Sequence, residues 1–380
     1  MNISIAKLYR SKTSEHEIIV AGGGISGAAL AYGLVAKGAK VTMIDAPTTT
    51  NKASRTNVGL IWCQSKFQHI PNYARWGFHS ARLFPELTRE LENISGINIP
   101  ASYTGGLIAC LGEDEFITRH NYIQKLRETL GEYPGSMISR AELQNKLPKI
   151  KFGPDVTGAA WCEADGVIDP LALLRAFKVA FCKLGGNLIE TLIHNVQPKD
   201  GGFRVTTDSG LMNCERIVLA TGLANRRFCQ FGISDLPVSA DKGQVLLVER
   251  MDRVMPIPLL GVTQTFGGTI IIGFRHESIG HDTRIVPEDI ASEGRWAIKI
   301  WPELRKRRLI RTWSGLRVMP KDKQAIYSRL PGHPKAILIN THSAVTMAAA
   351  HSRDLPDFIL GGDLPDMVRE MNLSRFGYSC

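Results

Sequence analysis

The stretch Ile18-Ile19-Val20-Ala21-Gly22-Gly23-Gly24-Ile25-Ser26-Gly27 determines the fold of the first part of the chain. A β-branched run enters a Gly-x-Gly-x-x-Gly turn, and an alanine-rich segment with a helical pattern follows it. Gly22 would allow the tight turn, Gly24 would let the backbone approach a pyrophosphate, and Gly27 would let the helix lie close to the strand. The helix N-terminus would offer N–H groups and a positive dipole end to phosphate oxygens. The stretch therefore predicts a phosphate-binding strand–turn–helix unit.

A second strand completes this unit and delivers an acid. Residues 41–44 have the composition of a buried strand, and Asp45 follows about 20 residues after the glycines, where a carboxylate can accept both hydroxyls of an adenosine ribose. Together these features predict a Rossmann-type dinucleotide site, with Ile25, Ser26 and Ala46 beside it. Because NAD and FAD share their ADP half, this part of the sequence fits both cofactors.

The composition is that of a soluble protein. The chain has 380 residues, of which 44% are hydrophobic and 22% charged, enough for two domains or one large one. Its apolar runs are far shorter than the roughly 20 residues that cross a bilayer, and residues 1–17 have no apolar stretch of signal-peptide length. We therefore expect a cytoplasmic protein without a transmembrane segment.

The cysteines suggest neither a disulfide framework nor a metal site. There are seven, an odd number, and none forms a C-x-x-C pair. Reduced thiols are the expected state in the cytoplasm. The cysteines are Cys63, Cys110, Cys162, Cys182, Cys214, Cys229 and Cys380.

The net charge of +10 raises the question of an acidic partner. The densest basic cluster is Arg305-Lys306-Arg307-Arg308, with Arg311 close behind. No zinc finger, aromatic RNA-binding strand or basic coiled coil accompanies it, so we expect no nucleic-acid partner. The cluster is interpreted as a solvated helix end or as a contact with an acidic partner chain.

Periodicity predicts an α/β protein whose dinucleotide-binding domain is discontinuous. Helices are expected over 72–94, 113–147 (with an interruption at 131–135), 171–184 and 343–351. Strands are expected over 105–111, 187–196, 203–207, 216–222, 243–249, 268–274 and 336–340. We assign residues 15–85, 155–235 and 312–380 to a Rossmann-type, glutathione reductase-like domain. Residues 86–154 and 236–311 would form an inserted α+β substrate or partner domain on a mainly antiparallel sheet.

Six segments give the chain a family resemblance. They are the glycine motif with its acid, Ser54 to Gly59, Asp165 to Pro170, Ala220-Thr221-Gly222, Gly315-Leu316-Arg317 and Thr341 to Ala349. In this order they resemble the D-amino acid oxidase and glycine oxidase-like flavoproteins along nearly the whole chain. Residues 57–62, 311–319 and 342–351 are most similar to β subunits of bacterial opine (octopine or nopaline) dehydrogenases and of D-hydroxyproline dehydrogenase.

The resemblance implies non-covalent FAD, since no residue matches the cysteine that anchors flavin in some relatives. The glycines and Asp45 would hold the ADP half of FAD. Ser54, Arg55 and Asn57 would lie along the pyrophosphate and the flavin edge, and the backbone of Ile193 would contact the adenine. The helix from 343 would aim its N-terminus at the flavin, where a positive dipole end favours the anionic reduced ring. The implied contacts are Gly22, Gly24, Ile25, Ser26, Gly27, Asp45, Ala46, Ser54, Arg55, Asn57, Val58, Gly59, Ile193, Ala220, Thr221, Gly222, Gly315, His342, Ser343, Ala344, Val345 and Thr346.

The same resemblance identifies candidate substrate residues. Arg317 matches the arginine that binds a substrate carboxylate, although a structural ion pair would also explain it. His342 is either a polar contact of the cofactor or an acid–base catalyst. The other histidines form no metal-ligand spacing, and none of them, including His276, His281 and His351, is given a role. The segment Thr341 to Val345 lacks the glycines of the glycine oxidase-like proteins, which favours a dehydrogenase over an oxidase.

The expected function is oxidation of the Cα–N bond of an amino acid-type secondary amine. The resemblance implies an opine that yields arginine and a 2-oxo acid, with this chain as the β subunit of a heteromeric complex. An α subunit and a small iron–sulfur subunit are the implied partners, and any second flavin or iron–sulfur centre would come with them, because these cysteines form no such site alone. The alternatives are a D-hydroxyproline, proline or sarcosine-type dehydrogenase or oxidase, an NAD-dependent dehydrogenase, and a non-catalytic FAD-carrying subunit.

Overall fold

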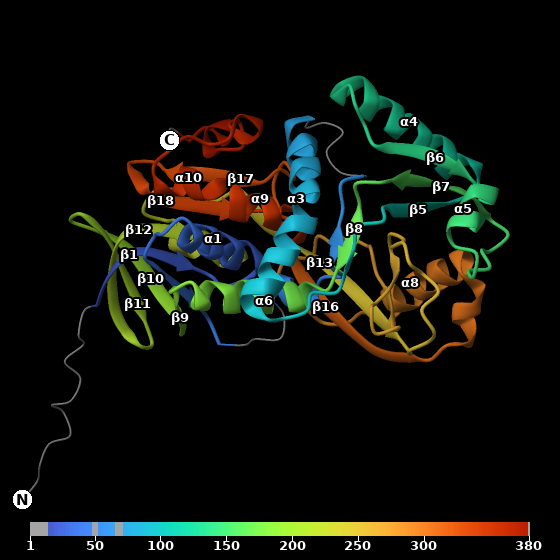
Figure 1. Cartoon of the computed structure of the whole chain (residues 1–380), viewed down its shortest axis with the longest axis horizontal. Helices are drawn as coiled ribbons and strands as arrows, with labels where there is room; N and C mark the ends of the chain where they lie inside the picture. The colour runs from blue at the N-terminus through green and yellow to red at the C-terminus, as the bar shows by residue number, and fades with distance from the viewer. Residues whose placement is uncertain (1–13, 48–51, 65–70, 379–380) are drawn as a thin grey trace, which may run out of the picture.

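A mixed sheet forms the left half of the molecule in Figure 1. The computed structural model describes residues 14–47, 52–64 and 71–378. Five strands run parallel and β17 forms an antiparallel edge, in the order β9-β2-β1-β12-β18-β17. The strands are β1 (Ser14–Ala21), β2 (Val41–Asp45), β9 (Asn187–Glu190), β12 (Gly210–Leu219), β17 (Ile326–Leu330) and β18 (His333–Asn340).

An antiparallel meander branches from the same sheet. β10 (Ile193–Lys199) pairs with β11 (Gly202–Thr207), which pairs with the first half of β12, while residues 217–219 of β12 pair with β18. The single strand predicted over 187–196 is therefore wrong. It is two strands, of which β9 joins the parallel sheet and β10 begins the meander.

Helices cover the other face of the parallel sheet. α1 (Ile25–Ala36), α3 (Pro71–Ser95), α6 (Pro170–Lys183) and α9 (Ala344–Arg353) share one hydrophobic core with it. Ile18 and Val20 of β1 join this core, whereas Ile19 and Ala21 join the core on the meander side, as alternation along a strand requires. α9 packs closely on α1 because Gly33 has no side chain, since a Cβ there would lie 2.1 Å from the Ser352 carbonyl oxygen.

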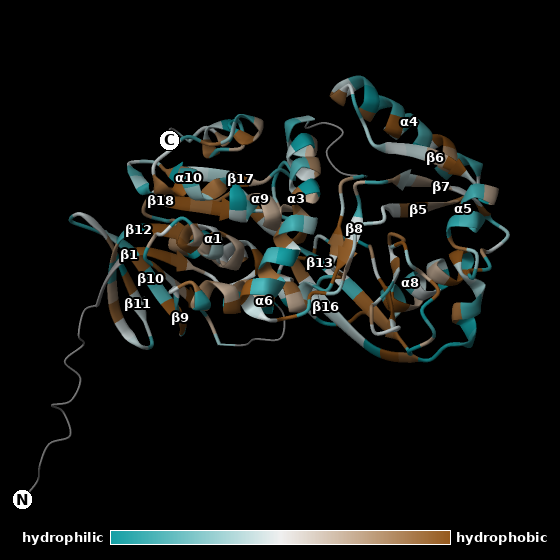
Figure 2. Cartoon of the chain, viewed as in Figure 1, coloured by the Kyte–Doolittle hydropathy of each residue, from teal (hydrophilic) through white to brown (hydrophobic). Residues whose placement is uncertain are grey.

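A second, antiparallel sheet forms the right half of the molecule (Figure 1). It has two parts, β5-β7-β6 and β14-β15-β13-β16, joined where Leu107 pairs with Leu259. Both sheets contain hydrophobic strands, for example β18 in the mixed sheet and β13 in the antiparallel sheet (Figure 2). The strands are β5 (Gly106–Leu111), β6 (Gly135–Ser139), β7 (Val156–Cys162), β13 (Val238–Val248), β14 (Val262–Gln264), β15 (Ile270–Ile272) and β16 (Leu309–Pro320).

The predicted helical segment 113–147 contains a strand. α4 (Glu113–Leu130) and α5 (Arg140–Lys146) are helical, but β6 lies between them and pairs with β7. β7 and β16 also pair within the antiparallel sheet, so the expected boundaries at 155 and 312 each separate a strand from its partners. The division into two folding units otherwise stays a prediction.

Short elements connect the two sheets. β8 (Gly166–Ile168) pairs with β3 (Leu60–Ile61) and β4 (Ala101–Ser102) between them. Among the described helices, none is both long and apolar enough to cross a membrane. The remaining elements are α2 (Ala53–Thr56), η2 (Gly222–Ala224), α7 (Asn225–Phe228), α8 (Pro287–Ile300), η3 (Pro302–Lys306), α10 (Leu355–Leu360), η4 (Asp366–Val368) and η5 (Leu373–Phe376).

Candidate active site

Most of the predicted cofactor contacts lie where the parallel strands end. The glycine turn follows β1, Asp45 ends β2, Ala220 follows β12, and residues 341–346 follow β18. The carboxyl ends of parallel strands meet at one edge of a sheet, which is the usual ligand site of such folds. The fold therefore brings these distant segments together.

Two glycines of the turn are required by the protein's own packing. Gly22 has φ +101°, and a Cβ there would lie 2.6 Å from the Ala220 carbonyl oxygen. A Cβ at Gly27 would lie 1.8 Å from the Gly22 carbonyl oxygen, so α1 can begin this close to β1 only with glycine. These contacts match the roles that the motif predicts for the two positions.

Gly24 has a different environment. Among the residues that the structure describes, a Cβ at this position would meet only Ser54, whose hydroxyl oxygen would lie 2.9 Å away. That hydroxyl accepts a hydrogen bond from the Ile25 amide at 3.0 Å, at the N-terminus of α1, whose first turn has no acidic residue. An oxygen acceptor thus already lies where the motif places a phosphate, and Gly24 leaves the space beside it open.

Asp45 is held by two lysines that sequence reasoning missed. Its carboxylate bonds the Lys178 ammonium at 2.8 Å and the Lys52 ammonium at 3.0 Å, and it accepts from the Gly23 amide at 3.1 Å. Burial raises the pKa of Asp45, but the hydrogen bonds and charges of Lys178 and Lys52 outweigh it and lower the pKa overall. Lys52 also donates to the carbonyl oxygen of Ala46. A charged acceptor therefore stands at the end of β2, as ribose binding requires.

A buried asparagine pair fixes the segment after β12. The Asn225 amide oxygen accepts from the Thr221 amide (3.0 Å) and hydroxyl (2.6 Å), while its nitrogen donates to Asn340 at 2.8 Å. Asn340 in turn donates to the Gly222 carbonyl oxygen at 3.0 Å. The ends of β12 and β18 are thus tied together. Neither asparagine belongs to a recognisable motif, so the sequence carried no signal for the pair.

The segment from Ser54 to Gly59 is shaped mainly by its own contacts. Asn57 donates to the Ser54 carbonyl oxygen at 3.0 Å and accepts from the Gly59 amide at 2.9 Å. Gly59 has φ +74°, and a Cβ there would lie 2.1 Å from the Ile168 carbonyl oxygen. Arg55 is exposed and Val58 is half-buried. Contact of this segment with the cofactor stays a prediction.

The N-terminus of α9 approaches the antiparallel sheet. The Thr346 hydroxyl accepts from the Trp62 amide at 3.0 Å, while Ala344 and Val345 begin the helix. The His342 ring lies 6.1 Å from the His276 ring, measured between centroids, in the segment that follows β15. The sequence alone gives no reason to assign a role to His276. The fold shows that its ring lies close to the His342 ring.

Gly315 brings β16 to the nucleotide-binding side. A Cβ there would lie 2.1 Å from the Thr56 hydroxyl of α2, so the strand and the helix touch at this point. Ile193 is buried at the start of β10 and pairs with Thr207. It follows Thr191, whose amide donates to the Asp45 carbonyl oxygen at 3.0 Å. Both predicted contacts therefore border the same edge of the parallel sheet.

Arg317 already has a carboxylate neighbour. Its guanidinium lies 3.5 Å from the Asp241 carboxylate on β13, donates to the Lys242 carbonyl oxygen at 3.1 Å, and covers Gly243. Burial lowers the pKa of Arg317, against the opposing charges of Asp241 and nearby glutamates. The side chain is 27% exposed. Asp241 is therefore a partner for a structural ion pair with Arg317. Binding of a substrate carboxylate by Arg317 stays a prediction.

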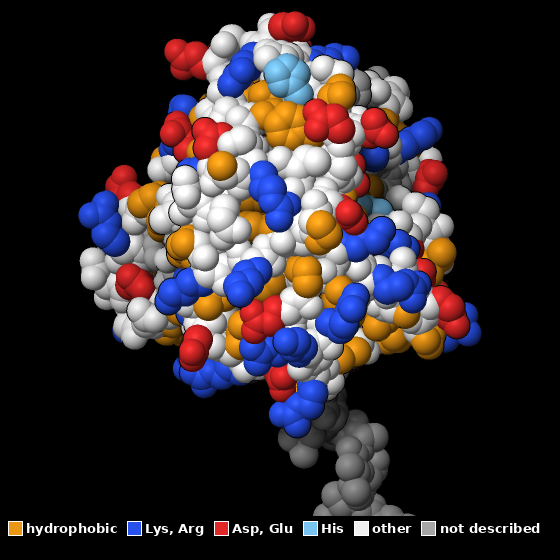
Figure 3. Space-filling view, turned by 90° about the vertical axis from the view of Figure 1, so that its right-hand side faces the viewer, with side chains coloured by type: hydrophobic (Ala, Val, Ile, Leu, Met, Phe, Trp, Pro, Cys, Tyr) orange, Lys and Arg blue, Asp and Glu red, His pale blue; other side chains and the backbone are white. Residues whose placement is uncertain are grey.

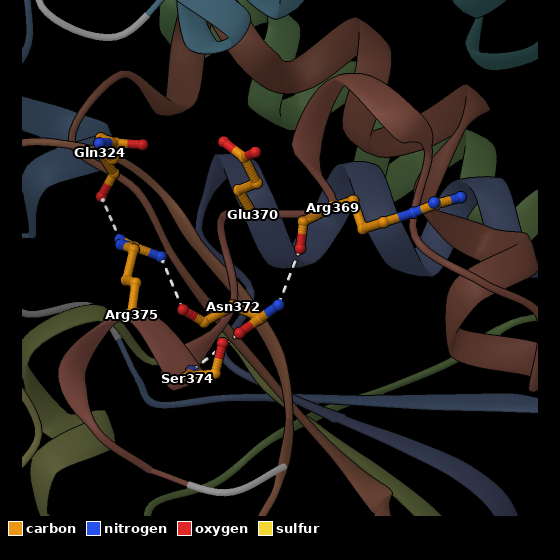
Figure 4. Close-up of a pocket in the computed structure, with 6 residues that line it drawn as sticks. All are labelled: Gln324, Arg369, Glu370, Asn372, Ser374 and Arg375. Carbon is orange, nitrogen blue, oxygen red and sulfur yellow. Dashed lines mark hydrogen bonds between the residues drawn. The ribbon is translucent and has the colours of Figure 1, made fainter.

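A cavity of about 540 Å³ lies away from these residues, between β17 and the C-terminal turns (Figure 4). Arg375 on its wall bonds Asp322 and the carbonyl oxygens of Ala325 and Asn372. The polar groups of Arg375 thus stabilise the wall of the cavity, and we assign no chemistry to the cavity. Its lining residues are Gln324, Arg369, Glu370, Asn372, Ser374 and Arg375.

The glycine turn, the acid after β2 and the strand order define a Rossmann-type dinucleotide-binding protein. The chain belongs to the family of FAD-dependent oxidoreductases, whose sequence model matches residues 17–356. This confirms the predicted family and fold, and FAD rather than NAD is the cofactor. The residues present fit its ADP half, because Gly24 leaves space at the start of α1 and Asp45 offers an ionised acceptor.

Relatives cover nearly the whole chain. It is 31% identical to an opine oxidase subunit of Agrobacterium tumefaciens (strain Ach5) over 95% of this chain and 98% of that protein. Glycine oxidase of Bacillus licheniformis is 24% identical over 91% of this chain and 93% of its own. Among solved structures, glycine oxidase from Geobacillus kaustophilus has a TM-score of 0.87 at 20% identity, covering 96% and 99%. L-proline dehydrogenase from P. horikoshii has a TM-score of 0.83 at 22% identity, covering 96% and 98%.

Proposed function

We propose that the chain oxidises the Cα–N bond of an opine such as octopine or nopaline, yielding arginine and a 2-oxo acid, as one subunit of a heteromeric complex. The observation that carries this proposal is the 31% identity to the opine oxidase subunit along nearly all of both chains. The glycine oxidases and the L-proline dehydrogenase support the broader interpretation, an amino acid-like amine as substrate.

Arg317 is the proposed anchor of the substrate carboxylate. Its guanidinium can form two parallel hydrogen bonds with a carboxylate and stays charged at any working pH. Because Asp241 is 3.5 Å away, the incoming carboxylate would compete with it for the same fork. FAD, when bound, supplies the acceptor for the hydride that leaves Cα. Water then hydrolyses the imine.

Anaerobic bleaching of the flavin tests the substrate. Purified holoprotein would be mixed with octopine, nopaline, D-hydroxyproline, proline, sarcosine and glycine, and the flavin absorbance followed. We expect octopine or nopaline to reduce the flavin fastest. If proline, D-hydroxyproline or sarcosine reduced the flavin faster, that amine would take the place of an opine as the proposed substrate. Failure of every compound with fully bound FAD would favour the non-catalytic, FAD-carrying subunit.

The partner subunit is proposed to dock at the basic end of the antiparallel sheet. Lys and Arg side chains gather in the lower half of the face in Figure 3. Arg307 and Arg308 pair with Glu303 and Glu249, but Arg305, Lys306 and Arg311 are exposed and form no ion pair with the described residues. Beside them Leu309 is 48% exposed and Ile310 58%, on a strand at the edge of its sheet. An acidic partner surface with apolar residues fits this end.

Electron transfer tests the heteromeric arrangement. A subunit that passes electrons to a partner should react slowly with oxygen and faster with an artificial dye. Peroxide formation by the isolated chain at its dye-linked rate would contradict the arrangement. A variant with Arg305, Lys306 and Arg311 changed to glutamate should keep FAD but no longer co-purify with co-expressed partner subunits.

A further inference from the structure

We propose that His276 and Asp241 form a proton-accepting pair that takes the ammonium proton of the substrate before hydride leaves Cα. This inference rests on the proposed function, because it concerns the amine nitrogen of the same substrate. The inference is based on the accessible imidazole of His276, which contacts the buried carboxylate of Asp241 beside Arg317, the proposed anchor of the substrate carboxylate.

The pair has one buried end and one accessible end. Asp241 is 5% exposed, and its Oδ2 atom contacts the Nδ1 atom of His276. The His276 side chain is 55% exposed. Arg317 lies 3.5 Å from the same carboxylate oxygen, and the His342 ring lies 6.1 Å from the His276 ring. A substrate held by Arg317 would therefore lie within reach of His276.

The other carboxylates nearby are already engaged. Glu277 forms an ion pair with the fully buried Lys242 at 3.1 Å, and Lys242 also donates to the Arg284 carbonyl oxygen. Glu293 on α8 accepts from the Phe274 and Arg275 amides. Asp241 is the carboxylate in contact with the imidazole. The charged or titratable groups around the pair are Lys242, Arg275, Glu277, Glu293, Arg317 and His342.

Asp241 also has a carboxylate oxygen without a donor. Its Oδ1 atom is buried and accepts no hydrogen bond from any residue that the structure describes. A buried carboxylate with one oxygen left without a donor, although Arg317 lies near the other oxygen, stabilises a positive charge next to it, here an imidazolium at His276. The same contact holds the ring in one orientation, as a carboxylate does in a catalytic triad.

The proton step is chemically simple. A hydride can leave Cα only if the nitrogen supplies an electron pair, so a protonated amine must first lose a proton. One ammonium N–H bond breaks, a new N–H bond forms on the imidazole, and the electron pair remains on the amine nitrogen. The hydride then leaves with the two electrons of the Cα–H bond, the nitrogen electron pair forms the C=N bond, and a protonated imine remains. The proton can pass from the exposed ring to water. Arg317 cannot perform this step, because a guanidinium has no acceptor.

The pH dependence of substrate-driven flavin reduction tests the pair. His276→Asn keeps a side-chain amide near the Asp241 carboxylate but removes the base. We expect reduction at pH 7 to slow about 100-fold, the lower end of the range for general acid–base catalysis. At pH 10 the substrate amine is largely deprotonated in water, so the rate should return to within a few-fold of the wild type. His281→Asn, an exposed histidine of the same segment, is the matched control and should change neither rate.

Two further variants keep the test decisive. Asp241→Asn should slow reduction at pH 7 and recover at pH 10, with FAD content per chain unchanged. Free imidazole should raise the rate of His276→Ala. A His276→Asn rate equal to wild type at pH 7, or reduced by the same factor at pH 7 and pH 10, overturns the pair. If no amine reduces the wild-type flavin, the proposed function falls and this inference with it, whereas a reducible wild type with an unaffected His276→Asn overturns the inference alone.

Discussion

The buried His351 should make the protein sensitive to mild acid. It lies on α9 with no solvent exposure, and its Nε2 atom is 2.9 Å from the Tyr327 hydroxyl, which also accepts from the Trp76 indole at 3.3 Å. The Nδ1 atom has no partner among the described residues. Burial lowers the pKa of His351 from 6.5 to about 3. The folded protein therefore keeps this histidine neutral.

The sign of the effect follows from this shift. Because the folded-state pKa is below the unfolded value, the unfolded chain takes up the proton first as the pH falls. The stability that His351 contributes is present above pH 6.5 and is lost between pH 6.5 and about 3. Each pH unit within this window corresponds to about 1.4 kcal/mol, so at pH 5 the loss relative to pH 8 is about 2 kcal/mol.

A pair of variants isolates this contribution. His351→Gln does not titrate and can still accept a hydrogen bond from the Tyr327 hydroxyl. Urea unfolding followed by tryptophan fluorescence at pH 8 and pH 5 gives the change in unfolding free energy for each protein. The wild type should lose about 2 kcal/mol more than His351→Gln between these pH values. His120→Gln, at an exposed position on α4, should behave as the wild type. Parallel losses in the wild type and His351→Gln would refute the reasoning.

Four substitutions at three positions test the cofactor and substrate residues. Gly27→Ala should give no soluble protein with native circular dichroism, because its Cβ would lie 1.8 Å from a backbone oxygen; a soluble, yellow Gly27→Ala would contradict the turn. Gly24→Val should fold but lose FAD, measured as flavin absorbance per chain, and full occupancy would contradict the phosphate site. Arg317→Ala should keep FAD and weaken substrate affinity roughly thirtyfold to several thousandfold, since breaking a buried charged pair costs about 2–5 kcal/mol. Arg317→Lys should already impair anaerobic reduction, whereas a normal rate per bound flavin with low FAD content would support a purely structural ion pair.

Local patterns predicted the parts of the fold that depend on local interactions. The strand–turn–helix unit follows from the steric needs of Gly22 and Gly27, and both needs are visible as close backbone contacts. The sequence failed where pairing with a distant strand decides the structure. β6 is a five-residue strand between two helices, and its partner β7 begins at residue 156. Such a partner overrides weak local preferences.

The missed site residues have the same cause. Lys178 reaches Asp45 from α6, 133 residues further along the chain. His276 meets Asp241 only because the segment after β15 continues alongside β13, where Glu277 pairs with Lys242. The break between β9 and β10 falls at Thr191 and Leu192, a pair without glycine or proline, so no turn signal marked it. Motifs and family resemblance predict site residues from local sequence patterns. These contacts join residues that are far apart in the sequence, so they become visible only in the folded structure.

The order of strands in the parallel sheet has a consequence for biosynthesis. β1 and α1 leave the ribosome early, but β18 and α9, which pack on β12 and α1, are made more than 290 residues later. At about 5–20 residues per second, the nearly wholly buried α1 waits about 15–60 s for its covering helix. During this interval the nascent chain exposes an apolar surface that only its own C-terminal region can cover. Chaperone demand should therefore be high, and a chain interrupted before residue 333 should aggregate rather than form a smaller native domain.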